Sequence, residues 1–470
     1  MPIKAPGPFS FCIFFVLFFA AFQPGKERHN IVAEKNAIQF SFDYSSNTLL
    51  HPPYVSGVIN DPGDPASVTG ITVDVTEDGQ PISAGDYSII AVSDNEEVVA
   101  KNKITCAKSA GHANIKIFPS AAGYSNITLT LTRNNKTATL DIFYAASSDP
   151  DNSGKTFWHT AMADASAAVT LDSDYMVVAD DEINALFVYH RYQSGLPVAF
   201  FSYNNLLQLP EEGKEIDCEA CAKSLRNPAR VYWTGSMSNG GKSFKEEPNR
   251  SCLFATEING TGAATKFDFK GAYLNLRKQL IKWGNANGYK LSAASAYGET
   301  PKQIGGFNIE GAAFAPDSNT LYIGFRAPIV PVTNRNNALI APIQNFEKWF
   351  NDGKPSGDPI IGNPIELDLG GRGIRDIIHL TNGNYIIVAG NSDEKLNEAL
   401  YSWTGKNTDK PVLLNINVQS LKSEAGIEID DNTVQLISDN GSTEYYNDGV
   451  AAKHLSTNFK KFHSNIVSLK

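Results

Sequence analysis

A pattern of short apolar runs recurs five times after residue 160 and limits what this chain can fold into more than any other feature. In each copy a polar or acidic residue precedes one apolar run, and a turn separates that run from a second. The copies start at Asp164, Asp217, Asn308, Gly373 and Ala425, so consecutive starts lie 53, 91, 65 and 52 residues apart. Repeats of roughly 40–50 residues built from such runs are typical of the blades of a β-propeller. We therefore expect an all-β chain with a propeller over residues 156–470.

The interval between the second and third copies leaves the number of blades at five or six. It contains either a degenerate blade or an insertion, and we expect six blades. Four of its residues share one face of a helix that Gly284 would end, namely Tyr273, Leu276, Leu280 and Trp283. A helical insertion is therefore expected there, and a second short helix is expected at 346–351.

The region from residue 30 to 145 has the alternation of a different kind of β-structure. Apolar residues occupy every second position in several short segments, as at Ile71, Val73 and Val75, and turn residues separate these segments. About 110 residues of this kind suit an immunoglobulin-like β-sandwich. A polar linker at 146–155 separates this module from the propeller.

The segment that contains Asp61 and Asp64 resembles the start of Ig-like or cadherin-like modules found in exported bacterial proteins. The two carboxylates could help to hold Ca²⁺ there. The alternative is that the Asp-Pro pairs of this segment form rigid turns, which we favour.

The first residues are expected to be an export signal. Lys4 provides a positive charge, and an unbroken apolar run of 14 residues follows at 9–22. A helix needs about 20 apolar residues to cross a bilayer, whereas ~7–15 suit the apolar part of a signal peptide. We therefore predict a signal peptide over 1–23 and a secreted, periplasmic or cell-surface protein without a later membrane-spanning segment. An uncleaved membrane anchor is the alternative.

The charge and the cysteines narrow the range of partners and compartments. A formal net charge of −10 argues against a nucleic-acid partner, because a protein surface that binds nucleic acid needs clustered Lys and Arg. It leaves room for cation binding and for a local basic pocket. After the signal peptide, either Cys252 forms a disulfide with Cys218 or Cys221, or all the cysteines are small buried side chains.

Five motifs carry a resemblance to a known group of proteins. They are Asp180-Asp-Glu, Asp217-Cys-Glu, Asn308-Ile-Glu-Gly-Ala, Gly324-Phe-Arg-Ala-Pro and Gly370-Gly-Arg-Gly-Ile-Arg-Asp. Over about residues 158–470 the chain resembles an uncharacterised family of secreted bacterial propellers, a domain of unknown function. It is more distantly similar to phytase-like propellers, whose blades open with Asp-x-Glu-Gly. Glu310 matches the Glu-Gly element, but the first copy has Ser166 and the last reads Ser423-Glu-Ala-Gly, so one acidic ring is incomplete.

Equivalent residues of the blades should converge on one axis, because the first strand of each blade lines the central channel. Acidic residues are expected at or near that position, at Glu219, Glu310 and Asp376, and at the ends of the following strands, at Asp181, Glu182 and Asp439. The candidate metal ligands among them are Asp181, Glu182, Glu219, Glu310 and Asp439. Converging carboxylates repel one another unless a cation or an arginine neutralises them, and these could hold Ca²⁺. A second set could bind a phosphate or carboxylate ligand: Arg326, Arg372, Arg375 and Asp376. The alternative is that both sets form ion pairs that fix the blades in register.

Two functions fit these residues. In the first, the channel binds a small anionic ligand or a surface glycan, with or without a divalent cation as a bridge. In the second, the protein is a calcium-dependent phytase-like phosphoesterase or lactonase, in which the cation polarises the substrate and Glu310 activates water. The chain lacks the G-x-S-x-G and H-E-x-x-H motifs of common hydrolases, and the acidic ring is incomplete. We therefore favour binding.

Overall fold

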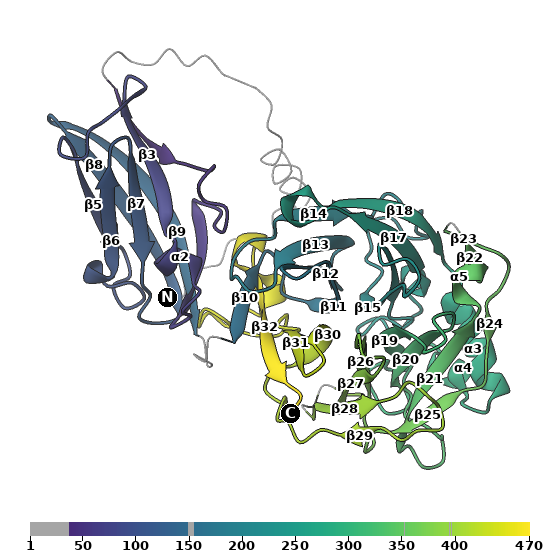
Figure 1. Ribbon diagram of the computed structural model, residues 1–470. Helices are drawn as coiled ribbons and strands as arrows, with labels where there is room; N and C mark the ends of the chain where they lie inside the picture. Colours follow the sequence, from purple (N-terminus) through teal and green to yellow (C-terminus); the bar gives the residue numbers. More distant parts are fainter. Residues whose placement is uncertain (1–36, 149–154, 352, 394, 396) are drawn as a thin grey trace.

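Strands are the main regular structure of the computed structural model, which describes residues 37–148, 155–351, 353–393, 395 and 397–470. The predicted signal peptide at 1–23 lies outside the described residues. None of the described helices combines the length and the apolar composition that crossing a bilayer requires. Figure 1 shows the strands in two groups, a smaller N-terminal group and a larger ring.

The N-terminal group is a sandwich of two sheets. The first sheet has the order β1 (Ile38–Phe42), β3 (Ile71–Glu77), β7 (His112–Ile117) and β6 (Ile104–Ser109), with β4 (Gln80–Pro81) beside β3. The second has the order β2 (Tyr54–Ile59), β9 (Lys136–Ser148), β8 (Gly123–Arg133) and β5 (Ser88–Ser93). Alternate residues of β3 and β8 are buried in one core, which confirms the predicted period of two: Ile71, Val73, Val75, Ile127, Leu129 and Leu131. The immunoglobulin-like assignment stays a prediction.

Within the described residues the ring contains five antiparallel sheets of four or five strands, and in four of these the strands are taken in sequence order. The first blade comprises β11 (Ala165–Thr170), β12 (Tyr175–Asp180), β13 (Ala185–His190) and β14 (Ala199–Ser202). The second comprises β15 (Cys218–Lys223), β16 (Arg230–Gly235), β17 (Leu253–Asn259) and β18 (Lys266–Tyr273). The third comprises β19 (Asn308–Phe314), β20 (Leu321–Ala327), β21 (Asn337–Gln344), β24 (Ile360–Ile361) and β25 (Ile365–Asp368). The fourth comprises β26 (Gly373–His379), β27 (Tyr385–Gly390), β28 (Ala399–Trp403) and β29 (Val412–Leu413).

The fifth blade closes the ring by joining the two ends of the propeller sequence. Its order is β10 (Thr156–Thr160), β32 (Lys461–Ser468), β31 (Thr433–Ser438) and β30 (Ser423–Asp430). β10 pairs antiparallel with β32, so a strand from the start of the propeller completes a blade built from its end. The innermost strands of the blades, β11, β15, β19, β26 and β30, contact one another in a closed circle, and Figure 1 looks along the axis on which they converge. The fold is therefore a five-bladed β-propeller.

The expectation of a sixth blade is wrong, because the long interval folds as helices. It forms α3 (Leu276–Ala286) and α4 (Leu291–Ala294) between the second and third blades. Leu276, Leu280 and Trp283 are buried on one face of α3, as predicted, but the helix continues two residues beyond Gly284. Tyr273, which was predicted on the same face, is instead the last residue of β18. The second predicted helix is α5 (Phe346–Trp349), followed by a small hairpin of β22 (Phe350–Asn351) and β23 (Lys354–Pro355).

The described cysteines are free thiols, so the disulfide alternative is wrong. Cys218 begins β15 and pairs with Gly235 of β16, whereas Cys252 precedes β17 on the other side of β16. Two strand spacings of about 4.8 Å separate them, which is more than the ~7 Å that a disulfide can bridge between Cα atoms. Both side chains are buried in the apolar core between the first and second blades.

Candidate functional site

A β-bulge near the start of each innermost strand decides which side chains face the channel. The pairing register shifts by one residue between the first and second strands of every blade. The extra residues are therefore equivalent around the axis: Ser166, Glu219, Glu310, Arg375 and Glu424. We call these five residues the bulge ring. Three carboxylates, one arginine and one serine thus occupy one level of the channel.

Glu310 is the most tightly held member of the bulge ring. Its Oε1 lies 2.8 Å from Nη1 of Arg326, and its Oε2 lies 3.0 Å from Nη1 of Arg375. The same Nη1 of Arg375 lies 2.5 Å from Oε1 of Glu424. Burial opposes ionisation of Glu310, but the two guanidinium groups hold the pKa of its carboxyl below the usual value. Both oxygens are engaged and the pKa is low, so Glu310 is poorly suited to activating water.

The predicted anion-binding set is also engaged within the protein. Besides its ion pair with Glu310, Arg326 donates to the carbonyl oxygens of Ser392 and Asp393. Arg372 donates to backbone and side-chain oxygens of Asn397 and to the Leu369 carbonyl. Arg326 and Arg375 thus form ion pairs of the kind that the sequence offered as the alternative to anion binding, whereas Arg372 forms hydrogen bonds.

Asp376 lies one residue beyond the bulge ring, and its two oxygens accept the backbone N–H groups of Ile377 and Gly426 at 2.7 and 2.8 Å. Burial raises the pKa of its carboxyl to about 7, although these two hydrogen bonds lower it. Asp376 therefore links β26 to β30 and does not face the carboxylates of the bulge ring.

A second acidic group, which shares Glu219 with the bulge ring, lies at the end of the channel where the innermost strands begin. Asp181, Asp217 and Glu219 each offer a carboxylate oxygen, and these oxygens all lie within 4.8 Å of one another. Oδ1 of Asp181 and Oε2 of Glu219 are buried and have no hydrogen-bond partner among the described residues. We call these three residues the acidic triad. Three converging carboxylates with unused oxygens match the ligands of a hard divalent cation.

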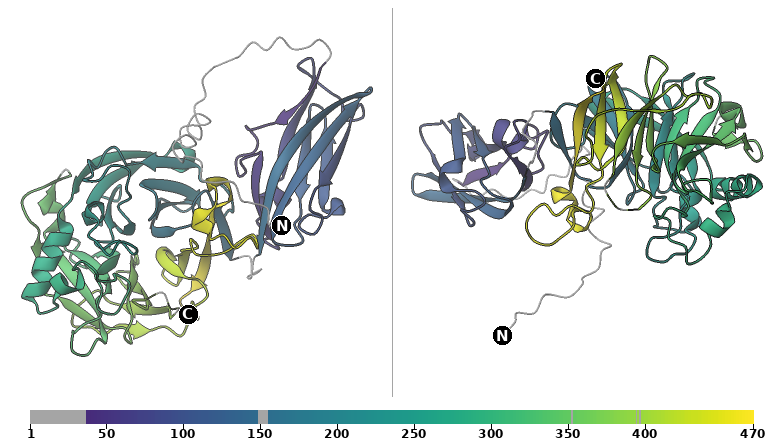
Figure 2. Two further views of the ribbon diagram at one scale, coloured as in Figure 1. Left: turned by 180° about the vertical axis from the view of Figure 1, so that it is seen from behind. Right: turned by 90° about the horizontal axis from the view of Figure 1, so that it is seen from below.

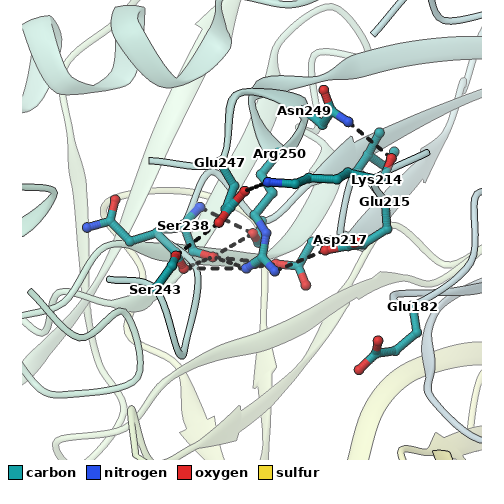
Figure 3. A network of polar contacts seen from close by, with 12 residues as sticks. Glu182, Lys214, Glu215, Asp217, Ser238, Ser243, Glu247, Asn249 and Arg250 are labelled. Atoms are coloured by element: carbon teal, nitrogen blue, oxygen red, sulfur yellow. Dashed lines mark hydrogen bonds and ion pairs between the residues drawn. The ribbon is translucent and has the colours of Figure 1, made fainter. Parts of the chain in front are cut away.

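The local chain structure brings the acidic triad together. Asp181 follows the last residue of β12, and Glu219 is the bulge residue of β15. Asp217 directly precedes β15 with a φ of 55°, a left-handed conformation that aspartate tolerates better than most residues. Its Oδ2 lies 2.9 Å from Nη1 of Arg250, which also pairs with Glu215. Figure 3 shows Arg250 directed at Asp217 and Ser238, so Arg250 fixes the orientation of Asp217.

The electrostatics of the acidic triad are unfavourable without a cation. Glu219 is 5% exposed. Burial, and next the charge of Glu219, raise the pKa of Asp181 well above its ordinary value. Burial, and next the charge of Asp217, raise the pKa of Glu219 in the same way. A bound cation would remove the repulsion that these shifts reflect.

The remaining predicted metal ligands lie near the triad without joining it. Glu182 is exposed and pairs with Lys453 at 3.3 Å. Asp439 is half-buried, accepts the N–H of Gly441 and forms a backbone bridge with Asp164. The sequence had not singled out Asp217 as a ligand. The sequence did contain a signal for this position, because an aspartate directly precedes the first strand of two repeats, at Asp164 and Asp217.

Comparisons with known proteins supply only distant similarities. No protein-family model matches the chain, and no curated protein matches it. A PQQ-bound aldose sugar dehydrogenase from Streptomyces coelicolor is 11% identical over 67% of this chain and 99% of that chain, with a TM-score of 0.28. A streptogramin B lyase is 8% identical over 82% and 99% of the two chains, with a TM-score of 0.28. A quinoprotein alcohol dehydrogenase-like protein from Bacteroides thetaiotaomicron is 10% identical over 86% and 82%, with a TM-score of 0.21. Similarities of this size say nothing about what this chain binds, and the propeller rests on the strand pairing described above.

Proposed function

We propose that this is an exported binding protein whose propeller holds a divalent cation, Ca²⁺, in the acidic triad. Through that cation the propeller binds a small anionic ligand or the hydroxyl groups of a glycan. The observation that carries the proposal is the convergence of three carboxylate groups, each with an oxygen within 4.8 Å of the others. Asp181 and Glu219 each have one buried carboxylate oxygen without a hydrogen-bond partner among the described residues. Export rests on the predicted signal peptide alone.

The number of ligands in the triad favours a bound cation with open positions. Ca²⁺ takes six to eight oxygen ligands, and three carboxylates cannot fill all of them. Arg250 occupies Oδ2 of Asp217, which leaves its other oxygen for the cation. The remaining positions would be filled by water or by oxygens of the ligand. A hydrolase would also need a group to activate water, and the engagement of Glu310 by two arginines favours binding over the phosphoesterase or lactonase alternative.

Calcium titration of the full-length chain tests the proposal. We expect CaCl₂ to bind and to raise the thermal midpoint relative to EDTA, because a ligand at 100 times its Kd stabilises the folded state by about 2.7 kcal/mol. Glu219→Gln and Asp181→Asn should each abolish both effects. Glu182→Gln is the matched control: this carboxylate is exposed and paired with Lys453, so its loss should change the Kd by no more than about twofold. Identical melts in Ca²⁺ and EDTA would rule out the cation site.

A further inference from the structure

The opposite mouth of the channel contains a cavity that the acidic triad does not use. Its volume is about 520 Å³, and the later residues of all five innermost strands line it. Ligand sites in proteins typically measure about 300–1,000 Å³. The cavity is open there because four of the strands present small residues to it: Ala168, Ala222, Ala312 and Gly426. It lies beyond the bulge ring along each strand, whereas the acidic triad lies where the strands begin.

The acidic residues that line the cavity are satisfied by donors of the protein itself. Asp376 accepts two backbone N–H groups, as described above. Asp172 accepts the N–H groups of Asp174 and Tyr175 and the hydroxyl of Thr261. Glu428 accepts the N–H and the hydroxyl of Thr381 at 2.8 and 2.6 Å. None of these carboxylates therefore needs a cation from a ligand.

The two cationic residues of the cavity, Lys223 and Arg191, have no ion-pair partner among the described residues. Nζ of Lys223 donates to the carbonyl oxygen of Thr170 at 2.9 Å, and it forms no ion pair among the described residues. Arg191 donates to the carbonyl oxygens of Glu428 and Asp172 and to Gln435, again without a carboxylate at ion-pair distance in the described part of the chain. Burial lowers the pKa of Lys223, which a nearby anion would reverse. Asp172 attracts both cations electrostatically, but no carboxylate of the described residues lies at ion-pair distance from either of them. Lys223 and Arg191 therefore lack a direct anionic partner within the described ranges.

We propose that this cavity is a second binding site, which takes a small organic monocarboxylate with Lys223 as its anchor. The carboxylate would accept the remaining N–H groups of the ammonium, since an ammonium has three donors and one is already used. A short apolar body would pack against Ala168, Ala312 and Ile427. A single charge fits better than a double one, because Asp172, Asp376 and Glu428 would repel a dianion. The site is independent of the cation in the acidic triad.

Butyrate is a suitable probe, with butyramide as its uncharged counterpart. We expect calorimetric titration of the full-length chain to show weak binding of butyrate and none of butyramide. Lys223→Met keeps the aliphatic stem and should weaken butyrate binding by at least about tenfold, whereas Lys223→Arg should retain it. Lys266→Met, which removes an exposed lysine of β18, should have no effect. Ala168→Leu, which fills part of the cavity, should abolish binding while calcium still raises the thermal midpoint.

The same titration separates this site from the proposed cation site. Butyrate binding should persist in EDTA and in Glu219→Gln, which would remove only the cation. Absence of butyrate binding, unchanged binding in folded Lys223→Met, or loss of binding in EDTA would each overturn the proposal. Binding of inorganic phosphate in place of butyrate would overturn the assignment to a monocarboxylate.

Discussion

Glu310 lies between two buried guanidinium groups, and its removal should lower the stability of the whole propeller. Glu310 and Arg326 are each 1% exposed, so neither charge has water to replace a lost partner. Breaking a buried ion pair from one side costs roughly 3–5 kcal/mol, because the remaining charge stays buried. We expect Glu310→Gln to lower the free energy of unfolding by about that amount, as measured by urea unfolding.

Glu424→Gln is the matched control for this residue. Glu424 is 17% exposed and shares Arg375 with Glu310, so its loss leaves no guanidinium unpaired and should cost less. The effect of Glu310→Gln should be the same with Ca²⁺ and with EDTA, since its oxygens are bound by arginines and lie outside the acidic triad. A loss of stability that appears only in Ca²⁺ would show that Glu310 belongs to the cation site instead.

Two glycines let the third and fourth blades approach closely. A Cβ on Gly311 of β19 would come within 2.6 Å of Cγ2 of Ile374, and one on Gly324 of β20 within 2.8 Å of the same atom. Added atoms in a packed interior typically cost about 1–3 kcal/mol. We therefore expect Gly311→Ala to destabilise the propeller by about that amount in thermal or urea unfolding. Gly241→Ala should be neutral, because a Cβ there meets nothing within 4 Å.

A double-mutant cycle identifies the contact responsible. Ile374→Ala removes the atom that the new methyl group would meet, so the cost of Gly311→Ala should be smaller in that background. Additive losses would show that the blades do not meet through this contact. The Glu-Gly pair at 310–311 then has a structural reason: the glutamate anchors two arginines and the glycine admits the neighbouring strand.

The innermost strands show which parts of the fold and of the candidate site could be predicted from the sequence. Each of them was predicted, because a strand buried between blades leaves a short apolar run that a polar residue precedes and a turn follows. The bulges were not predicted, since an alternating pattern does not reveal where one extra residue is inserted. One inserted residue exchanges the side chains that face the channel, which is why Arg375 rather than Asp376 stands in the bulge ring. The same ambiguity hid Glu424, which the sequence placed before its repeat rather than in the ring.

The sandwich and the propeller meet at a junction that no local pattern in the sequence indicates. Lys461 of β32 is buried, and its Nζ donates to the carbonyl of Gly57 and to the hydroxyl of Ser147, both at 2.9 Å. The same ammonium lies over three aromatic rings: Trp158, Tyr445 and Tyr446. Lys461 and Gly57 are 404 positions apart, so only the folded chain brings them together. Figure 2 shows the sandwich and the yellow C-terminal strands side by side in both views.

Asp64 gives this junction a dependence on pH. Both of its carboxylate oxygens are buried without a hydrogen-bond partner among the described residues, and Lys461, Asp61 and Tyr144 are titratable groups that interact with it. Burial raises the pKa of Asp64 from 3.8 to about 7, against the attraction of Lys461. The folded protein therefore keeps a proton that the unfolded chain releases above pH ~4, so stability is lost as the pH rises from about 4 to 7. At about 1.4 kcal/mol per pH unit, the loss amounts to roughly 4 kcal/mol at most.

Asp64→Asn should remove that loss, because the amide stays neutral at every pH in this range. We expect the variant to match the wild type near pH 4 and to exceed it by up to about 4 kcal/mol at pH 8, as measured by urea unfolding at both pH values. At pH 8 the variant leaves little cationic charge unpaired, since burial lowers the pKa of Lys461 to about 7. Asp86→Asn, at an exposed position of the sandwich, should leave the pH profile unchanged. Parallel profiles for the wild type and Asp64→Asn would mean that Asp64 is solvated in the folded protein and that the junction opens to water.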